Sequence, residues 1–406
     1  MTRHPFNSAS WNWMLGIALG GLYVVGIYAL IGARPLSDEN YHFSQIAQFL
    51  HHDWRAIPEL TTVPGYHLVI AATMRIVHAH TLDAARLIHA LCGLIAIAGF
   101  HALRRQVWSG TETIATAQFM ALPILAPLFF LLYTDVPAIA LLLWATLATL
   151  CGRHFLSALL MCLIIGVRQH EAVWALFLIS LAVFDLPPQE RRVRTIAITV
   201  LPYVLPLIGF AIFWWWNGSI SLASSLERFH PDFSFHAGNV FVAILVAGLL
   251  MPLHTLAGFR DFSLLARRKP WLVAAPIAVF AAFWFGFSAD NPYNLVMPDY
   301  YLHNGLVDAM SHGTWRVAAG IVVACAACGL ATIPLRPRGA WAVYVIGAAF
   351  LAASWVVELR YVAVPFVIWL ALREQKNTKI EVATLALWLV LAVLIFAKIV
   401  KYQLFL

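Results

Sequence analysis

Residues 11–31 read WNWMLGIALGGLYVVGIYALI, a stretch without a single Asp, Glu, Lys or Arg. An apolar run of about 20 residues is long enough to cross a bilayer as a helix. It is too long for a removed signal peptide and lacks a small-residue cleavage site, so we interpret it as a membrane anchor. Two acids, Asp38 and Glu39, follow it almost at once.

The composition of the whole chain agrees with this first segment. Hydrophobic residues make up 62% of the 406 residues and charged residues 11%, with a mean hydropathy of +0.80. Soluble globular proteins are nearer about 45–50% apolar and about 25% charged. We therefore predict one all-α, polytopic transmembrane domain over residues 1–406, with about 11–13 spans. The candidates are 12–32, 84–103, 114–132, 136–151, 155–167, 171–184, 196–216, 239–256, 272–288, 316–334, 340–357, 361–372 and 380–400.

Charge is distributed unevenly between the two sides of this layout. With a cytoplasmic N-terminus, most of the 26 Lys and Arg residues fall in short inner connections, as the positive-inside rule expects. Most of the 19 acids fall on the other side, where the connections 33–82, 217–238 and 289–314 are long. The inner arginines explain the pI of 9.3, so we expect no nucleic-acid partner.

The first outer segment contains two predicted short helices. Residues 41–49 alternate apolar and polar residues in a pattern typical of an amphipathic helix on a membrane surface. Pro64 and Gly65 mark a turn at 61–66, and residues 67–77 form a second apolar helix too short to span. The chemistry of the protein is therefore expected on the outer face.

Ionisable residues beside this face have two interpretations each. Asp38 and Glu39 could take a proton from an alcohol, or could be solvated acids in a loop. Asp135 could bind a substrate or cap the helix that follows it. Arg168 and Glu171, three residues apart, could form an ion pair, although a guanidinium is also a good phosphate ligand.

The second half of the chain presents the same choice. Glu358-Leu359-Arg360-Tyr361 stands at the outer end of a predicted span, and Asp299 and His303 lie in the third outer segment. These residues could form a site or simply belong to a surface loop. The five cysteines lie in apolar runs without the further ligands that a zinc site needs, so no metal is expected.

Several motifs resemble one family, in that family's order. Residues 38–45, Asp-Glu-Asn-Tyr-His-Phe-Ser-Gln, resemble the Asp-Glu-x-Phe-His-x-x-Gln element of the dolichyl-phosphate-glucose alpha-1,2-glucosyltransferases. Residues 131–135 resemble its Leu-Tyr-Tyr-Thr-Asp/Glu, and Arg168-Gln169 falls where the family has Arg-Gln-Thr-Asn. Residues 358–361 resemble its Glu-x-Arg-Tyr. Residues 170 and 171 depart from the family, because His and Glu replace Thr and Asn.

This resemblance implies a GT-C architecture and an inverting transfer of glucose from a polyprenyl- or dolichyl-phosphate donor to a glycan or lipid-linked oligosaccharide. Asp38 is implied as the base, with Glu39 as its rival or orienting partner. Arg360, Arg168 and Tyr361 are implied at the donor phosphate. Substrate-binding positions would be His42, Gln45, Asp135, Tyr133, Asp299 and His303. No cofactor or metal is implied, and membrane lipids would surround the protein.

Other assignments stay open at this point. The preference for Arg over Lys favours a bacterial inner-membrane protein with a periplasmic site, and a eukaryotic chain would face the ER lumen. A GT-C enzyme for another sugar, such as mannose or aminoarabinose, fits the same motifs. A transporter of lipid-linked sugars would share the composition but would carry repeats and polar groups near mid-membrane. A purely structural membrane protein would not need acids gathered on one face.

Overall fold

The computed structural model of the chain describes residues 9–222, 231–232 and 234–406, so part of the expected outer loop 217–238 lies outside the described residues. Within this part the chain forms seventeen α-helices and short 3-10 turns, with two isolated β-bridges and no strand. The predicted all-α class is confirmed. The α-helices are α1 (Ala9–Ala29), α2 (Glu39–Leu50), α3 (Gly65–Ile76), α4 (Leu82–Val107), α5 (Glu112–Met120), α6 (Asp135–Leu150), α7 (His154–Val167), α8 (Trp174–Asp185), α9 (Val193–Asn217), α10 (Gly238–Leu250), α11 (Pro252–Arg268), α12 (Ala274–Gly286), α13 (Leu302–Ser311), α14 (Gly313–Leu330), α15 (Ala342–Ala352), α16 (Leu359–Leu372) and α17 (Thr378–Val400). The 3-10 helices are η2 (Ala126–Phe129), η3 (Gln169–Val173), η4 (Pro188–Glu190), η6 (Pro270–Val273), η7 (Pro292–Leu295) and η8 (Arg338–Trp341).

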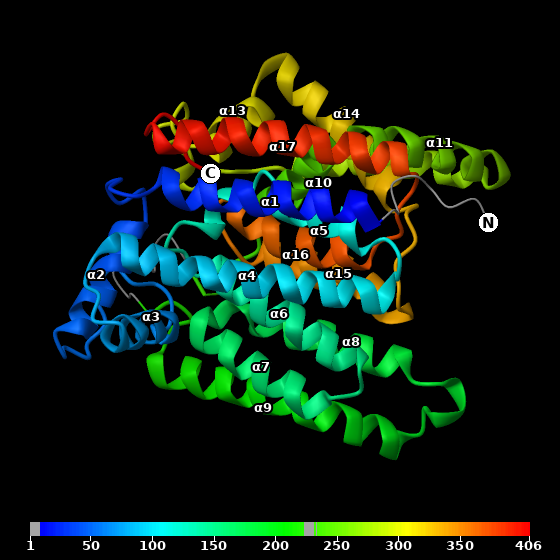
Figure 1. Cartoon of the computed structure of the whole chain (residues 1–406). Helices are drawn as coiled ribbons and strands as arrows, with labels where there is room; N and C mark the ends of the chain where they lie inside the picture. Colours follow the sequence, from blue (N-terminus) through cyan, green and yellow to red (C-terminus); the bar gives the residue numbers. More distant parts are fainter. Residues whose placement is uncertain (1–8, 223–230, 233) are drawn as a thin grey trace.

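Most long helices run along one common direction as a bundle (Figure 1). On one side α4 packs on α6, α6 on α7 and α7 on α9, and on the other α10, α11 and α12 surround α14. Helix α16 lies between these groups and is almost entirely buried. The short helices α2 and α3 cap one end of the bundle, at which the C-terminus also lies.

Among the described residues, four helices, α4, α9, α14 and α17, are long and apolar enough to cross a membrane. The bent pair of α10 and α11 would make a fifth, and six further apolar helices are shorter. The chain is thus an integral membrane protein by its helices, although many of the expected spans are not single full-length helices.

The expected span 239–256 is broken. Helix α10 ends at Leu250, and α11 leaves at an angle of 102°. Pro252 has no backbone N–H and cannot continue the preceding helix. The polar residues Arg260, Asp261, Arg267 and Arg268 then make α11 amphipathic, unlike a continuous span.

The expected span 114–132 was also wrong. The chain forms only the nine-residue helix α5 and then the 3-10 turn η2. Pro123 and Pro127 interrupt the helical hydrogen bonding in between. This irregular segment is nevertheless buried, with Leu128 and Leu131 fully inside the protein. It lies next to the residues that form the candidate site.

The two short helices predicted in the first outer segment are confirmed as α2 and α3. Their apolar faces bury Ile46, Phe49, Ile70 and Met74 in a second cluster, which also includes residues of α4, α6 and α7. Gly65, at the start of α3, packs directly on the backbone of Gly166 in α7. The pair of helices is therefore held against the bundle by packing rather than standing free in solvent.

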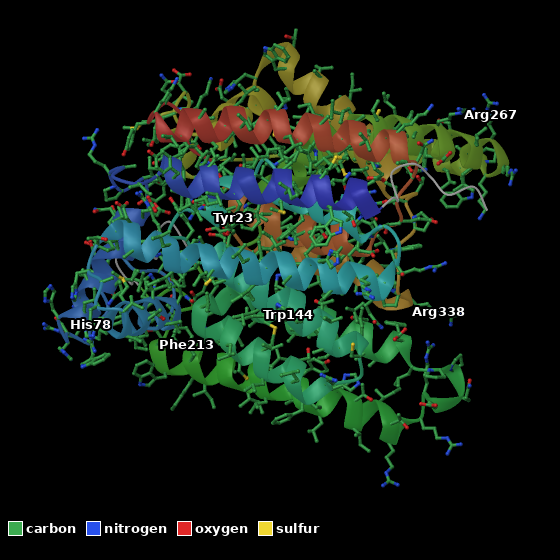
Figure 2. The ribbon with its side chains drawn as sticks, in the orientation of Figure 1. Tyr23, His78, Trp144, Phe213, Arg267 and Arg338 are labelled. Atoms are coloured by element: carbon green, nitrogen blue, oxygen red, sulfur yellow. The ribbon has the colours of Figure 1, made fainter. Side chains whose placement is uncertain are left out.

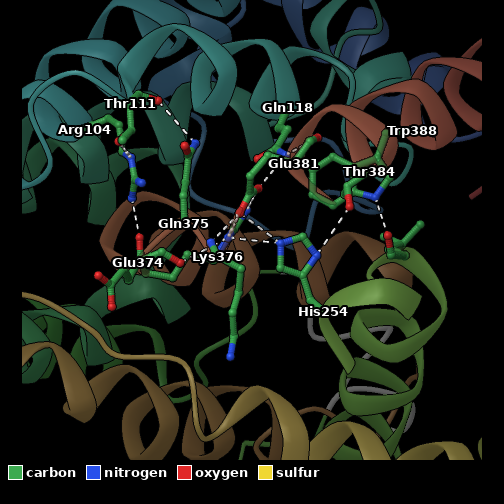
Figure 3. Close-up of polar contacts among 12 residues, drawn as sticks. Arg104, Thr111, Gln118, His254, Glu374, Gln375, Lys376, Glu381, Thr384 and Trp388 are labelled. Atoms are coloured by element: carbon green, nitrogen blue, oxygen red, sulfur yellow. Dashed lines mark hydrogen bonds and ion pairs between the residues drawn. The ribbon is translucent and has the colours of Figure 1, made fainter. Parts of the chain in front are cut away.

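The opposite end of the bundle is basic. Arg267 and Arg338 lie at that end, far from His78 beyond α3 (Figure 2). A buried polar network is also formed there by Gln118 of α5, His254 of α11 and Glu381 of α17 (Figure 3). Arg373 donates hydrogen bonds to Gln118 and Glu381. The Arg373 guanidinium lies 2.6 Å from the Glu381 carboxylate, which also lies 3.0 Å from His254. The separation of basic and acidic segments inferred from sequence thus corresponds to two ends of the molecule.

Candidate functional site

A cavity of about 520 Å³ opens where the long outer segments meet. It lies between the start of α2, the start of α6, the turn after α7, the segment before α13 and the start of α16. Its charged and titratable lining residues are Asp38, Tyr41, His42, Glu59, Asp135, Arg168, His170, Tyr293, Tyr301, His303, Glu358, Arg360 and Tyr361. Four segments far apart in sequence thus contribute charge to one space.

The two acids that follow the first helix point in different directions. Ser37 adopts a left-handed conformation with φ of 51°, and α2 begins at Glu39. Neighbouring residues at the start of a helix do not face the same way. The Asp38 side chain lines the cavity and is 40% exposed, whereas that of Glu39 is 0% exposed.

The Glu39 carboxylate forms all of its contacts inside the protein. Its carboxylate lies 2.6 Å from Arg86 of α4 and accepts hydrogen bonds from the backbone N–H groups of Leu36 and Leu132, both at 2.9 Å. Arg86 also donates to the carbonyls of residues 30, 33 and 34. This network joins α2, α4 and the segment that follows the end of α1, so its geometry is that of a structural ion pair.

Arg360 faces Asp38 across the cavity. Its Nη2 lies 3.1 Å from Asp38 Oδ2 and 2.6 Å from Glu358 Oε2. The guanidinium is also stacked 5.0 Å from the centre of the Tyr133 ring. Tyr133 itself is completely buried, and its hydroxyl accepts a hydrogen bond from the Asp38 N–H at 3.1 Å. The ring therefore supports both charged residues from behind.

A second arginine lies deeper. Arg168 forms a buried ion pair with Asp135, and its Nε lies 3.5 Å from Glu171. Arg168 also donates to His170 Nε2 at 3.0 Å and lies over the Tyr361 ring. The predicted spacing of Arg168 and Glu171 does bring them together, but on a 3-10 turn rather than on an α-helix.

Glu171 is the acid with the most unusual environment. Burial raises its pKa to about 7, although the Arg168 charge acts in the other direction. Neither of its carboxylate oxygens has a hydrogen-bond partner among the described residues. Glu171 beside the Arg168–Asp135 pair is therefore expected to change between its neutral and charged forms near neutral pH.

The remaining predicted site residues divide into two groups. His42, His303 and Tyr361 line the cavity, and burial lowers the pKa of His42 to about 3 and that of His303 as well. Gln45 does not line it; its amide instead binds the backbone of residues 55 and 57 and orders the loop after α2. Asp299 is exposed and lies outside the cavity lining.

Phe405 and His67 are among the contributors that were not predicted from the sequence. Phe405 lines the cavity because residues 402–406 fold back over α13, with the Phe405 N–H donating to the Tyr300 carbonyl at 2.7 Å. Its ring stacks on Tyr133 with centroids 5.8 Å apart. His67 lies behind His42, joined to it by a hydrogen bond of 2.8 Å. Neither residue carries a signal in its local sequence that relates it to the cavity.

A smaller cavity of about 190 Å³ adjoins the first. The two share Thr61, Thr62, His170 and Tyr361, so these residues form the partition between them. No group of three or more His, Cys, Asp or Glu side chains within the described part of the chain is arranged to hold a metal ion. The chemistry available in the cavity is that of carboxylates, guanidinium groups and neutral imidazoles.

Comparison with known proteins gives an independent view of this region. A sequence model described as the DIE2/ALG10 family matches residues 33–197. The matched segment contains Asp38, Asp135 and Arg168 but not Arg360. The family resemblance inferred from the motifs is therefore confirmed for this part of the chain.

Two fungal relatives carry the same name, Dol-P-Glc:Glc(2)Man(9)GlcNAc(2)-PP-Dol alpha-1,2-glucosyltransferase. The one from Candida glabrata is 24% identical over 259 residues, covering 54% of this chain and 48% of the relative. The one from Yarrowia lipolytica is 24% identical over 223 residues, covering 46% of this chain and 43% of the relative. The matched region thus spans less than half the length of either relative.

Solved structures give a weaker likeness over a longer stretch. Two crystal structures of ArnT from Cupriavidus metallidurans, one in the apo state and one bound to undecaprenyl phosphate, each align with a TM-score of 0.44. Their sequence identities are 16% and 14%, and each alignment covers 94% of this chain and 78% of that chain.

Proposed function

We propose that this protein is a membrane glycosyltransferase of the GT-C type that moves glucose from a polyprenyl- or dolichyl-phosphate donor to a hydroxyl of a glycan acceptor. The observation that carries the proposal is the pairing of Asp38 with Arg360 in one cavity. One of these side chains can take a proton, and the other can hold a phosphate. The family match over residues 33–197 and the names of the two relatives support the same chemistry.

The proposed reaction needs one base and one site for the leaving group. Asp38 removes the proton of the acceptor hydroxyl as that oxygen attacks the anomeric carbon. The bond from this carbon to the phosphate oxygen breaks, and its electron pair leaves with the phosphate. The attack comes from the face opposite the phosphate, so the anomeric configuration is inverted.

Arg360 and Arg168 would stabilise the negative charge that grows on the phosphate. A guanidinium binds phosphate oxygens through two parallel N–H groups, and a buried site strengthens this interaction. Tyr361 lies beside both arginines on the cavity wall and would help to position the phosphate. We assign Glu39 to holding α2 in place, because Arg86 and two backbone N–H groups already occupy its carboxylate.

Donor binding and base release are coupled in this scheme. Without a donor, Asp38 and Glu358 both compete for the Arg360 Nη2 group. A phosphate that takes this group would displace Asp38, which is the more exposed of the two carboxylates, with 40% of its side chain accessible against 15%. The carboxylate is then free to accept a proton only when a donor is present.

The position of the cavity supports a proposal for the substrates and the location. The cavity is lined by residues at the start of α2, a helix at one end of the bundle (Figure 1), where a lipid phosphate would sit at the membrane surface. We place this end on the non-cytoplasmic side, which is the periplasm for a bacterial inner membrane or the lumen for the ER. The acceptor would be a glycan or a lipid-linked oligosaccharide.

The test is transfer of labelled glucose by the purified protein from a polyprenyl-phosphate donor to lipid-linked oligosaccharide acceptors. Asp38→Asn should lower kcat by about two to four orders of magnitude, since a positioned base contributes about that much. Asp308→Asn is the matched control, because Asp308 is 71% exposed on α13 and pairs only with His312. Wild-type protein that transfers glucose from no lipid-phosphate donor would refute the function, and an active Asp38→Asn variant would refute the base.

A further inference from the structure

Two histidines from different helices form a buried pair at the wall of the cavity. His42 Nδ1 of α2 lies 2.8 Å from His67 Nε2 of α3, and the rings are stacked with centroids 5.1 Å apart. His42 lines the cavity, but His67 is completely buried behind it. The T-shaped contact of His42 with Tyr133 holds its ring from a second side. The His42 ring therefore has little freedom to turn.

The hydrogen bond between the rings leaves one nitrogen of His42 for a ligand. His42 Nε2 has no hydrogen-bond partner among the described residues. This atom is not completely buried, and His42 lines the cavity, so Nε2 is open to the cavity. His67 Nδ1, in contrast, is fully buried and has no hydrogen-bond partner of normal geometry among the described residues, and the polar group that acts on this ring from the buried side is the backbone carbonyl of Pro64.

The buried side of the pair decides which nitrogens carry protons. A carbonyl can only accept a hydrogen bond, so Pro64 favours a proton on His67 Nδ1. The Nε2 atom of His67 then carries a lone pair, and it accepts a hydrogen bond from the Nδ1–H group of His42. In a neutral imidazole only one nitrogen carries a proton, so His42 Nε2 must also present a lone pair to the cavity.

Neutrality of both rings follows from their surroundings. Burial, together with the positive charges of Arg360 and Arg168, lowers the pKa of His42 to about 3, although Asp135 acts in the other direction. Burial likewise lowers the pKa of His67 well below its usual range. A ring with so low a pKa does not take up a second proton near neutral pH, but its lone pair can accept a hydrogen bond. His42 is thus unsuited to the role of base, which the proposed reaction assigns to Asp38.

We propose that His67 is a positioning residue that fixes the tautomer of His42, so that His42 Nε2 accepts a hydrogen bond from one sugar hydroxyl in the cavity. The proposal rests on the proposed function, since it assigns a specificity contact to the same site. The hydroxyl belongs either to the donor glucose or to the acceptor glycan, and both sources present the same chemistry.

The adjacent residue pair supplies a matched control. Tyr66 and His89 form a second buried hydrogen bond of 2.8 Å in the same region, but His89 Nε2 binds the Leu128 carbonyl at 2.9 Å. Both nitrogens of His89 are therefore used within the protein, and neither Tyr66 nor His89 lines the cavity. His89→Phe removes the same group from the same environment without touching a substrate contact.

The experiment compares His67→Phe, His67→Gln and His89→Phe in the glucose-transfer assay, with a thermal melt of each purified variant. His67→Phe should lower kcat/KM about tenfold, the usual effect of one lost hydrogen bond, because His42 is freed to present an N–H instead. His67→Gln should recover most of this activity, since its amide oxygen can accept the His42 proton. His89→Phe should lower the melting temperature but leave kcat/KM unchanged at a permissive temperature.

Deoxy sugars identify the contact itself. Donors and acceptors that each lack one hydroxyl are assayed with wild type and with His42→Phe. One analogue should give the same kcat/KM with wild type and with His42→Phe, because it lacks the hydroxyl that binds His42. With every other analogue, His42→Phe should have a lower kcat/KM than wild type. Two results would overturn the inference. One is a loss of kcat/KM in His67→Phe no larger than that in His89→Phe, and the other is a loss in His42→Phe of equal size with every analogue. Both results require active wild-type protein, so they are distinct from a failure of the proposed function.

Discussion

At the scale of single residues, Glu171 makes the stability of the folded protein depend on pH. Its pKa of about 7 in the folded protein lies above the 4.5 of an ordinary glutamate. Between these values the folded protein binds a proton that the unfolded chain has already released. The contribution of Glu171 to stability is therefore fully present below pH 4.5 and is lost as pH rises to about 7, by at most about 3 kcal/mol.

Glu171→Gln should remove this pH dependence, because a glutamine stays neutral throughout. The measurement is the melting temperature of detergent-solubilised protein between pH 5 and pH 8. Glu190→Gln is the control, since Glu190 is exposed at the far end of α8 and its loss should leave the wild-type slope intact. A Glu171→Gln variant with the full wild-type slope would show that another group is responsible.

At the scale of elements, the contact of α3 with α7 depends on a glycine. A Cβ at Gly65 would collide with the backbone carbonyl of Gly166, which cannot move aside as a flexible side chain can. Gly65→Ala should therefore push α3 away from α7 and destabilise the protein by about 1–3 kcal/mol. Because α3 carries His67, transfer activity should fall as well.

The same contact offers its own control. A Cβ at Gly166 would meet no atom within 4 Å, so Gly166→Ala adds a methyl group to open space. That variant should be as stable as wild type or more so, since alanine favours a helix over glycine by up to about 1 kcal/mol. Equal melting temperatures for the two alanine variants would contradict the proposed packing role of Gly65.

At the scale of the whole molecule, the two ends of the bundle have separate roles. The network around Glu381 is remote from the cavity and joins α5, α11 and α17 (Figure 3). Arg373→Met would leave the Glu381 carboxylate buried without its cationic partner, at a cost of about 3–5 kcal/mol in stability. The KM for the donor should not change in the fraction that remains folded.

An exposed ion pair beside this network tests whether burial of the charges causes the loss of stability expected for Arg373→Met. Lys376 pairs with Asp261, whose side chain is 51% exposed. Surface pairs contribute about 0–1 kcal/mol, so Lys376→Met should shift the melting temperature much less than Arg373→Met. A raised donor KM in Arg373→Met would mean that the two ends are coupled.

The sequence alone was sufficient for the class of fold and named several residues that line the cavity. Long apolar runs favour membrane helices, and amphipathic spacing marks surface helices, so both signals are local. The predictions for α2, α3 and the all-α class depended on nothing else. Among candidate residues, Asp38, His42, Asp135, Arg168, His303, Arg360 and Tyr361 were named from motifs and do line one cavity.

Only the tertiary structure distinguished residues that are alike in sequence. Asp38 and Glu39 are adjacent acids, yet Glu39 is buried against Arg86 and Asp38 faces the cavity. His67 and Phe405 gain their positions from contacts with residues distant in the chain. Hydrophobic pattern is set by neighbours along the chain, but the direction of a side chain at a helix start, and the partner it meets, depend on how helices pack in space.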